Sequence, residues 1–497
     1  MIIETSTGNK YMYIPALNII IPVSRSIPNS IIKKLSSATT VELLKSVLDE
    51  IERGQINLPS VESLIKLLNL YIKYYENLKN VTKNFNENDT ITGEYIREYL
   101  LRQGYKQLTL EVTQRCNLRC KYCIYSEYYP TYRSHSTLDM PWSICKKAID
   151  IYFGYLNEGS RYNPNRVPVI GFYGGEPLLK FGLIKQSVEY IRDKYGEWKE
   201  TMFTITTNGT IINDKIIKFL VDNNFQIIVS LDGPKEIHDA NRVFPNGRGS
   251  YEYVSKFLRK VREFGGEAYA NATFTPTTNL MECDRFFSKN SDVVLLRMNP
   301  VSLEENSTYY QQFTENELKR LRDQIRLIRE SYKKGLGQKQ ANMSVSAVMM
   351  VEEIFPLLFK LNSLPFPGAI IPYTGACVPG TKLYVNSKGD IHICEKVPPF
   401  YPIGHVDRGL DFEKIAEFLN LFRKNVLSKC RGCPIRHLCE FCHIHFLKEE
   451  GINKPNNLCG SLYSDLVDRI RITLELLEEY PDLESLLTSV RALKGVE

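Results

Sequence analysis

The sequence predicts an α/β fold built on a parallel sheet. The middle of the chain alternates short apolar runs, rich in β-branched and aromatic residues, with amphipathic runs whose apolar residues recur every three or four positions. The expected strands are 107–113, 167–172, 203–207, 226–231, 267–274 and 293–299, and the expected helices include 212–222 and 251–264. Such repeats predict parallel strands wrapped by helices. The pattern fits a partial barrel or a doubly wound sheet equally.

Composition places the chain among ordinary globular proteins. Its 497 residues are enough for several domains, and 43% hydrophobic and 24% charged residues are typical of a soluble protein. A net charge of +6 without a Lys/Arg block does not predict nucleic-acid binding. No apolar run reaches the ~18 residues of a membrane span, and the first residues lack a signal-peptide layout. We therefore expect a cytoplasmic protein without a membrane partner.

The first hundred residues predict a separate α+β region. Segment 10–23 reads as one or two strands. A helix is expected to begin near Thr39, because Thr39 and Glu42 fit a capping box. A second helix is expected to begin near Ser60, and its apolar stripe consists of Leu64, Leu68, Tyr71, Tyr75 and Leu78.

A set of three cysteines follows the first strand of the predicted sheet. Cys116, Cys120 and Cys123 come directly after segment 107–113, where the carboxyl end of a parallel strand presents a loop to a pocket. Cysteines at such short spacing in a reducing compartment favour metal binding over disulfides. Three thiolates could bind three irons of a [4Fe–4S] cluster and leave the fourth iron open. The spacing alone also fits a structural zinc site or three packed thiols.

Three further motifs lie at the ends of the next three strands. A Gly-Gly-Glu-Pro element follows the second strand, and its glycines allow close backbone approach while its glutamate can receive an ammonium group. A Thr-Asn-Gly turn follows the third strand, and a Ser-Leu-Asp-Gly-Pro segment ends the fourth. An arginine a short way beyond it offers a planar fork suited to a carboxylate. The residues of interest are Gly174, Gly175, Glu176, Thr207, Asn208, Ser230 and Arg242.

Taken in this order, the cysteine triplet and the three motifs resemble the radical S-adenosylmethionine (radical SAM) enzymes. The family signature is Cys-x3-Cys-x-aromatic-Cys, and Tyr122 occupies its aromatic position. The resemblance implies a partial (β/α)6, TIM-like barrel rather than a doubly wound sheet. It also implies that the three cysteines hold a [4Fe–4S] cluster whose open iron binds SAM. One electron from the cluster then cleaves SAM, and the resulting 5′-deoxyadenosyl radical abstracts a hydrogen atom from the substrate.

The same resemblance assigns the SAM contacts. Tyr122 would lie against the adenine, and Gly174, Gly175 and Glu176 would hold the amino group. Ser230 and Arg242 would reach the carboxylate and ribose region. Thr207 and Asn208 would also belong to the cofactor-binding set.

A second cysteine set lies beyond the barrel, after a Pro- and Gly-containing stretch, 365–380, that reads as a linker. A zinc ribbon is one interpretation of its four central cysteines. After a radical SAM barrel, the set resembles the SPASM extension, which carries two auxiliary [4Fe–4S] clusters. The family run ends in Cys-x3-Cys, whereas two residues separate Cys439 from Cys442 here. The set comprises Cys377, Cys394, Cys430, Cys433, Cys439, Cys442 and Cys459.

Family topology would give one auxiliary cluster Cys430, Cys433, Cys439 and Cys459, and the other Cys377, Cys394 and Cys442. Three clusters with one iron reserved for SAM need one more protein ligand than the two sets supply. We expect a substrate cysteine thiolate at the open auxiliary iron, because thiolates are natural ligands there. A His, a carboxylate, water, Cys145 or Cys283 are the alternatives. Cys145 lies in a helical pattern and Cys283 near a helix start, so both are interpreted as packed thiols.

The resemblance divides the chain into five parts. These are an N-terminal α+β domain at 1–100, the barrel at 101–340, a linker and bridging helix at 341–370, the SPASM domain at 371–465, and C-terminal helices at 466–497. In similar enzymes an N-terminal domain captures a leader peptide by adding it as a strand. A stabilising cap is the alternative role for this region.

The expected function is that of an oxidoreductase that matures a ribosomally made, Cys-containing precursor peptide by forming a thioether. An external reductant such as flavodoxin or ferredoxin would be its second partner. Carbon–carbon crosslinking and conversion of Cys or Ser to formylglycine, as in anaerobic sulfatase maturases, are the alternatives. Sulfatase maturases carry an aspartate after the cysteine of a Gly-x4-Cys unit, and Glu395 occupies that position as a candidate base. An iron–sulfur electron carrier or peptide scaffold is the non-enzymatic alternative.

Overall fold

The computed structural model describes residues 1–24, 26–54, 59–81, 89–302, 307–335, 344–361, 370–371, 374–454 and 458–480. The chain forms two compact units. The first contains Met1–Ile91, Met350–Val378 and Phe418–Glu497, and the second contains Thr92–Met349 and Pro379–Glu417. Because each unit is assembled from separated stretches, the units are interleaved along the chain. The five-part division expected from sequence stays a prediction. Residues 481–497 of its last part, 466–497, lie outside the described residues.

The second unit is built on a ten-stranded sheet in the order β13-β12-β11-β10-β4-β5-β6-β7-β8-β9. Strands β4 to β9 are parallel and follow one another in chain order. A doubly wound sheet would reverse its order at a switch point, so this order indicates a barrel-type arrangement. The six strands are β4 (Gln107–Thr113), β5 (Val169–Gly174), β6 (Met202–Thr207), β7 (Gln226–Ser230), β8 (Ala268–Phe274) and β9 (Val294–Pro300). All six agree with the predicted strands to within two residues.

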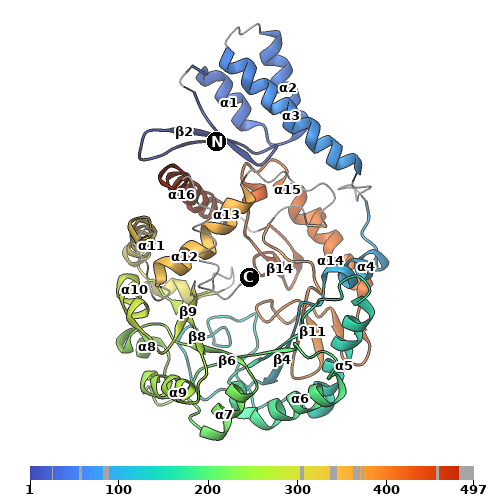
Figure 1. The fold of residues 1–497 in the computed structure, drawn as a ribbon, viewed down its shortest axis with the longest axis vertical. Helices are drawn as coiled ribbons and strands as arrows, with labels where there is room; N and C mark the ends of the chain where they lie inside the picture. The colour runs from blue at the N-terminus through green and yellow to red at the C-terminus, as the bar shows by residue number, and fades with distance from the viewer. Residues whose placement is uncertain are drawn as a thin grey trace. The chain divides into compact units, whose positions relative to one another are not determined.

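Helices connect these strands and lie around their outer side (Figure 1). Polar caps fix several of their starts. The Asn213 side chain accepts hydrogen bonds from the first-turn amides of α7, and the Asn279 side chain caps α10 in the same way. The connecting helices are α5 (Trp142–Gly159), α6 (Phe181–Lys194), α7 (Asp214–Asp222), α8 (Lys235–Asn241), α9 (Tyr251–Glu263) and α10 (Leu280–Lys289), and α4 (Gly93–Gln103) precedes them.

Four short strands extend the sheet beyond β4, and the sequence analysis did not predict them. Strand β10 (Lys382–Val385) pairs in parallel with β4, with Lys382 opposite Gln107. Strands β11 (Asp390–His392), β12 (Gly404–His405) and β13 (Gly409–Leu410) continue antiparallel. The chain that follows β11 carries Cys394 and Glu395. These two residues and the cysteine triplet therefore follow strands of the same sheet.

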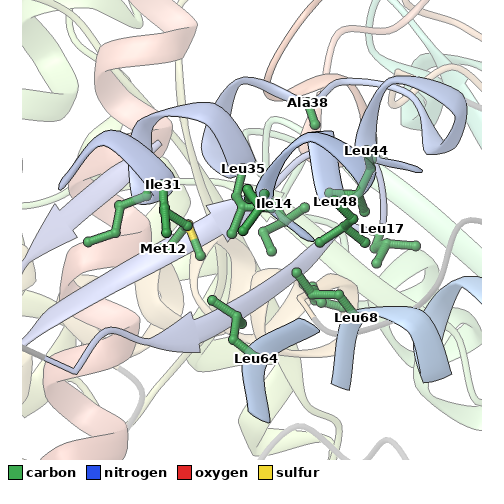
Figure 2. Close-up of a cluster of buried hydrophobic side chains, with 14 of the residues drawn as sticks. Met12, Ile14, Leu17, Ile31, Leu35, Ala38, Leu44, Leu48, Leu64 and Leu68 are labelled. Atoms are coloured by element: carbon green, nitrogen blue, oxygen red, sulfur yellow. The ribbon is translucent and has the colours of Figure 1, made fainter. Parts of the chain in front are cut away.

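The first unit begins with a three-stranded antiparallel sheet of β1 (Ile2–Glu4), β2 (Lys10–Ile14) and β3 (Ile19–Pro22). Helices α1 (Asn29–Ser37), α2 (Val41–Arg53) and α3 (Pro59–Val81) pack on it. Their shared core includes Met12, Ile14, Ile31, Leu35, Leu44, Leu48, Leu64 and Leu68 (Figure 2). Tyr71 and Tyr75 of the predicted stripe pack against this core, while the Leu78 side chain lies outside the described residues.

The predicted capping residue of α2 is wrong by one position. The N-cap is Thr40, whose hydroxyl accepts a hydrogen bond from the Leu43 amide at 3.1 Å. Two adjacent threonines precede the helix, and both satisfy the sequence rule in part. Thr40 has the extended backbone of an N-cap, and its side chain lies three residues before the Leu43 amide that it caps.

The other face of the N-terminal sheet is also covered. Tyr13 and Ile20 lie in a core that includes Leu466 and Ile470 of α16 (Leu458–Glu479) and Leu357 of α13 (Phe355–Lys360). Near the end of α16, Glu478 accepts hydrogen bonds from the hydroxyl groups of Thr5, Thr7 and Tyr11 and from the Asn9 amide. The N-terminal sheet is thus an integral part of the first unit.

The remaining elements are short or lie in the later part of the chain. They are α11 (Glu315–Gly335), α12 (Val345–Glu353), α14 (Phe412–Phe422), α15 (Ser428–Cys430), and the hairpin of β14 (Leu447–Lys448) and β15 (Gly451–Ile452). Within the described part of the chain, no helix is long and apolar enough to cross a membrane.

Candidate functional site

The sequence motifs meet at one edge of the large sheet. Cys116 follows β4, Gly174 ends β5, Thr207 ends β6 and Ser230 ends β7. Because these strands are parallel and adjacent, their carboxyl ends lie side by side. The fold therefore gathers at one edge four motifs that are separated by more than a hundred residues of sequence.

Three half-buried cysteines form the centre of this edge. Residues 116–123 are called the cysteine loop below. The Leu118 amide donates a hydrogen bond to the Cys116 sulfur at 3.4 Å, and the Tyr125 amide donates one to the Cys123 sulfur at 3.4 Å. Burial raises the pKa of Cys116 and of Cys120 to about 12. Thiols in such surroundings become thiolates when a metal supplies the compensating positive charge.

Glu176 joins two of the motifs. Its side chain is fully buried and accepts hydrogen bonds from the Asn208 amide at 2.7 Å, the Thr207 hydroxyl at 2.7 Å and the Leu178 amide at 3.0 Å. Burial raises the pKa of this carboxyl group to about 7, although the three donors oppose the rise. A carboxylate offers about four acceptor positions, so one position is left for a further donor.

Two glycines of the Gly-Gly-Glu-Pro element are required by close backbone packing. Gly174 has a φ of 143°, and a Cβ atom there would lie 2.1 Å from the Thr113 carbonyl oxygen. A Cβ atom on Gly175 would lie 2.1 Å from the carbonyl oxygen of Arg115. Neither distance is possible for a larger residue. The glycines therefore allow the end of β5 to lie in contact with the backbone just before the cysteine loop.

Asp232 organises the other side of the loop, and the sequence analysis did not single it out. Its carboxylate is 1% exposed and forms an ion pair with Arg242 at 3.0 Å. It also accepts hydrogen bonds from the Tyr122 hydroxyl and from the Thr273 amide at 2.9 Å. The Arg242 guanidinium lies 5.4 Å from the centre of the Tyr122 ring, and it is close enough to the Cys120 thiol to oppose the burial-driven rise in the pKa of that thiol. One buried carboxylate thus connects Tyr122 and Arg242, which are two of the predicted SAM contacts.

Arg242 keeps one donor available. The residue is 8% exposed, and its Nε atom is buried without a hydrogen-bond partner among the described residues. A buried guanidinium N–H without an acceptor is costly, so an additional acceptor at this point would be favourable. Ser230 is the last residue of β7, and it pairs in register with Asn271 of the neighbouring strand β8.

Glu395 lies near this edge of the sheet. The pKa of the Tyr173 phenol is raised first by burial and then by Tyr125. The Glu395 carboxylate and the Cys123 thiol are also close enough to Tyr173 to raise its pKa. Tyr173 is in β5, immediately before Gly174. The structure therefore brings Glu395 and the end of the cysteine loop to the same tyrosine.

Four cysteines of the second set come together within the first unit. The pKa of Cys439 is raised to about 12, mainly by burial, and the nearby thiols of Cys430, Cys433 and Cys459 contribute to the rise. These are the four residues that the resemblance groups in one auxiliary cluster. Arg469, only 2% exposed, fixes the turn after Cys439 through its ion pair with Glu440 at 2.6 Å.

The other three cysteines of the set divide between the units. Cys377 and Cys442 belong to the first unit, and Cys394 belongs to the second. The Cys377 and Cys442 segments are joined by a hydrogen bond from the Gly375 amide to the Phe441 carbonyl at 2.8 Å and by His443, whose Nε2 lies 2.6 Å from the Cys377 carbonyl oxygen.

The two remaining cysteines are packed in helices, as the sequence pattern predicts. Cys145 in α5 and Cys283 in α10 are both fully buried. Cys145 lies 3.2 Å from the Ser187 hydroxyl, and the Cys283 thiol donates to the Asp232 carbonyl at 3.5 Å.

Among the residues that the structure describes, no group of three or more His, Cys, Asp or Glu side chains is arranged to hold a single metal ion. In a [4Fe–4S] cluster each thiolate binds a different iron. The cysteines of a cluster site therefore need not converge on one point.

Comparison with known proteins identifies the central part of the chain. Residues 110–288 match the model of the Radical SAM superfamily. The chain contains a radical SAM domain. The matched segment begins in β4 and ends in α10, so it includes the cysteine loop, Glu176, Asn208, Asp232 and Arg242.

Three relatives match part of this chain. A serine-type anaerobic sulfatase-maturating enzyme of Bacteroides thetaiotaomicron is 31% identical over 32% of this chain and 36% of its own length. The radical SAM cyclopropyl synthase TigE of Paramaledivibacter caminithermalis is 25% identical over 42% of this chain and 43% of its own length. An uncharacterized protein of Methanocaldococcus jannaschii is 37% identical over 30% of this chain and 45% of its own length. The chain thus spans less than half of each relative.

The fold is similar to that of a solved structure. Native anSMEcpe with bound AdoMet and Cp18Cys peptide superimposes with a TM-score of 0.58 and 19% identity, covering 76% of this chain and 99% of that one. This likeness, together with the sequential parallel strands, confirms the predicted α/β fold with a radical SAM barrel and a cysteine-rich C-terminal region.

Proposed function

We propose that this protein is a radical SAM maturase that abstracts a hydrogen atom from a ribosomally made, Cys-containing peptide and forms a thioether crosslink. The observation that carries the proposal is the convergence of three half-buried cysteines with the buried Glu176 and Arg242 at one edge of a radical SAM domain. The similarity to sulfatase-maturating enzymes and to TigE supports a peptide or protein substrate.

The donor set at this edge fits a [4Fe–4S] cluster and SAM. Cys116, Cys120 and Cys123 would bind three irons, and SAM at the fourth iron would supply the 5′-deoxyadenosyl radical. Glu176 has an acceptor position left for the amino group, and Arg242 has the free Nε donor for the carboxylate. Gly174 and Gly175 allow close packing against the backbone of Thr113 and Arg115, just before the cysteine loop.

Two auxiliary [4Fe–4S] clusters are part of the proposal. Cys430, Cys433, Cys439 and Cys459 would hold one, which the proximity of their thiols within the first unit supports. Cys377, Cys394 and Cys442 would hold the other and leave one iron to the thiolate of the substrate cysteine. Coordination would keep that sulfur deprotonated and would fix its position. An external reductant such as flavodoxin or ferredoxin would supply electrons.

Formylglycine formation is the second candidate activity, and the similarity to anaerobic sulfatase-maturating enzymes supports it. In either reaction Glu395 would serve as a base, which its position near Tyr173 and the cysteine loop supports. A carbon–carbon crosslink would use the same hydrogen abstraction and would leave the peptide thiol free. A carrier or scaffold without SAM chemistry is the non-enzymatic alternative.

The N-terminal sheet is proposed to recognise the leader of the peptide. Its strand order, β1-β2-β3, makes β1 and β3 edge strands of their sheet. An extended leader could add to such an edge through backbone hydrogen bonds. If the region is a stabilising cap instead, removing the leader from the peptide will not change its affinity for the protein.

Product analysis tests the proposed reaction. The protein is reconstituted anaerobically and incubated with SAM, dithionite and a peptide encoded beside its gene. A thioether lowers the peptide mass by about two units per link, for the two hydrogens removed, and makes the thiol resistant to alkylation. An aldehyde product indicates the sulfatase-maturase activity. A mass loss with the thiol still reactive indicates a carbon–carbon link.

A further inference from the structure

Each of the three thiols in the cysteine loop has one polar side chain beside it. Asn208 Nδ2 lies 3.8 Å from the Cys116 sulfur, the Arg242 guanidinium lies near the Cys120 thiol, and His135 Nε2 lies 3.8 Å from the Cys123 sulfur. Asn208 and Arg242 belong to the motifs that the sequence analysis singled out. His135 belongs to none of them, and the proposed function gives it no role.

The surroundings of the His135 ring determine which way this hydrogen bond runs. Its other ring nitrogen, Nδ1, is buried and has no hydrogen-bond partner among the described residues. A thiolate can only accept a hydrogen bond, so the ring nitrogen that faces it must carry the hydrogen. Tyr125 contacts the ring edge-on, with ring centres 6.2 Å apart and planes at 75°. The favoured form is therefore an imidazole that donates from Nε2 to Cys123.

Residues on both sides of His135 are anchored to strand β4 or to the residue that follows it. Arg133 donates to the Glu111 carboxylate at 2.7 Å, and the Ser136 hydroxyl donates to the Gln114 side chain at 2.7 Å. Gln114 in turn donates to Glu111 at 3.0 Å, and Glu111 is 1% exposed. These hydrogen bonds on both sides of His135 fix the segment that carries its ring.

We propose that His135 donates a hydrogen bond to the Cys123 thiolate and thereby raises the reduction potential of the [4Fe–4S] cluster assigned to the cysteine loop. The inference rests on the proposed function, because it requires that cluster. Reduction adds negative charge to the cluster and its sulfur ligands, and a donor stabilises the more negative state more strongly. Outer hydrogen bonds of this kind tune metal centres in general. His135 is a positioning residue that acts through Cys123.

Two substitutions of His135 and one control test this role in the full-length, reconstituted protein. H135F keeps a ring for the contact with Tyr125 but removes the donor, and H135Q retains an N–H donor. S134A changes the neighbouring exposed side chain. The midpoint potential is measured by redox titration of the EPR signal that changes when SAM is added. We expect H135F to shift the reduction equilibrium about tenfold, or about 59 mV to the negative for one electron, H135Q to shift it less, and S134A to leave it unchanged.

An unchanged potential in H135F, at wild-type iron content, overturns the inference and leaves the proposed function intact. Absence of any SAM-sensitive signal in the wild-type protein overturns the proposed function itself. If H135F loses iron, H135A is compared with H135Q. A more negative potential in H135A then supports the role of the donor, and equal potentials contradict it.

Discussion

At the scale of single residues, the site depends on buried charges that the protein itself must compensate. Asp232 is the clearest case, because it pairs with Arg242 and accepts a hydrogen bond from Tyr122. Both members of the ion pair are buried. The sequence gives no reason to separate this aspartate from an ordinary turn residue, since Asp before Gly-Pro is typical of turns. Its role depends on long-range contacts that only the fold creates.

Removing the charge of Asp232 is expected to destabilise the protein strongly. Asp232→Asn keeps the side-chain shape but leaves the Arg242 guanidinium buried without a counter-ion. Breaking a buried pair from one side costs about 3 to 5 kcal/mol. The free energy of unfolding is measured by denaturation in urea. Asp222→Asn is the matched control, because it breaks the exposed Lys218–Asp222 pair and is expected to cost less than about 1 kcal/mol. Equal losses in the two variants would contradict the buried pairing.

Glu176 is expected to make stability depend on pH. Burial raises its pKa in the folded protein from 4.5 to about 7. The folded state therefore binds the proton more tightly than the unfolded state, and stability falls as the pH rises from about 4.5 to about 7. Glu176→Gln keeps the shape without a charge and removes this contribution. Relative to that variant, the apoprotein should lose on the order of 3 kcal/mol between pH 4.5 and pH 7.5. A difference between the two proteins that does not change with pH would show that the carboxyl group titrates normally.

At the scale of elements, local pattern predicts the large sheet well and its extension poorly. Strand β4 and the five strands that follow it have apolar runs with clear breaks between them, and the structure forms strands at these positions. Strands β12 and β13 have only two residues each, which is too short for any periodicity. Strand β10 pairs with β4 from a distant part of the chain, and such pairing leaves no local signal. The position of Glu395 could not be derived for the same reason.

The start of helix α2 gives a direct test at this scale. Thr40→Ala removes the side chain that accepts from the Leu43 amide, and the loss of an N-cap costs about 1 kcal/mol. Thr39→Ala changes the adjacent residue with the same loss of atoms, and its effect should be within about 0.5 kcal/mol of zero. Thermal or urea unfolding of the two variants distinguishes the positions. A larger effect for Thr39→Ala would restore the capping box expected from sequence.

At the scale of the whole molecule, the chain consists of two interleaved units with different cysteine sets. The radical SAM domain and the cysteine loop lie in the second unit, and six of the seven later cysteines lie in the first. Cysteine spacing indicated both sets, because cluster ligands leave a strong sequence signal. The interleaving itself could not be read from sequence, since it arises from contacts between the two ends of the chain, such as those of Glu478 with Thr5 and Asn9.

The measurement that tests the central claim most directly is reductive cleavage of SAM by the reconstituted protein. Under anaerobic conditions with dithionite, the wild-type protein is expected to form 5′-deoxyadenosine. A variant in which Cys116, Cys120 and Cys123 are replaced by alanine should form none and should carry about four fewer irons, the content of one cluster. Replacing Cys145 by alanine is the control, because that thiol is packed in α5. A wild-type protein that holds its irons but forms no 5′-deoxyadenosine would contradict the proposed function.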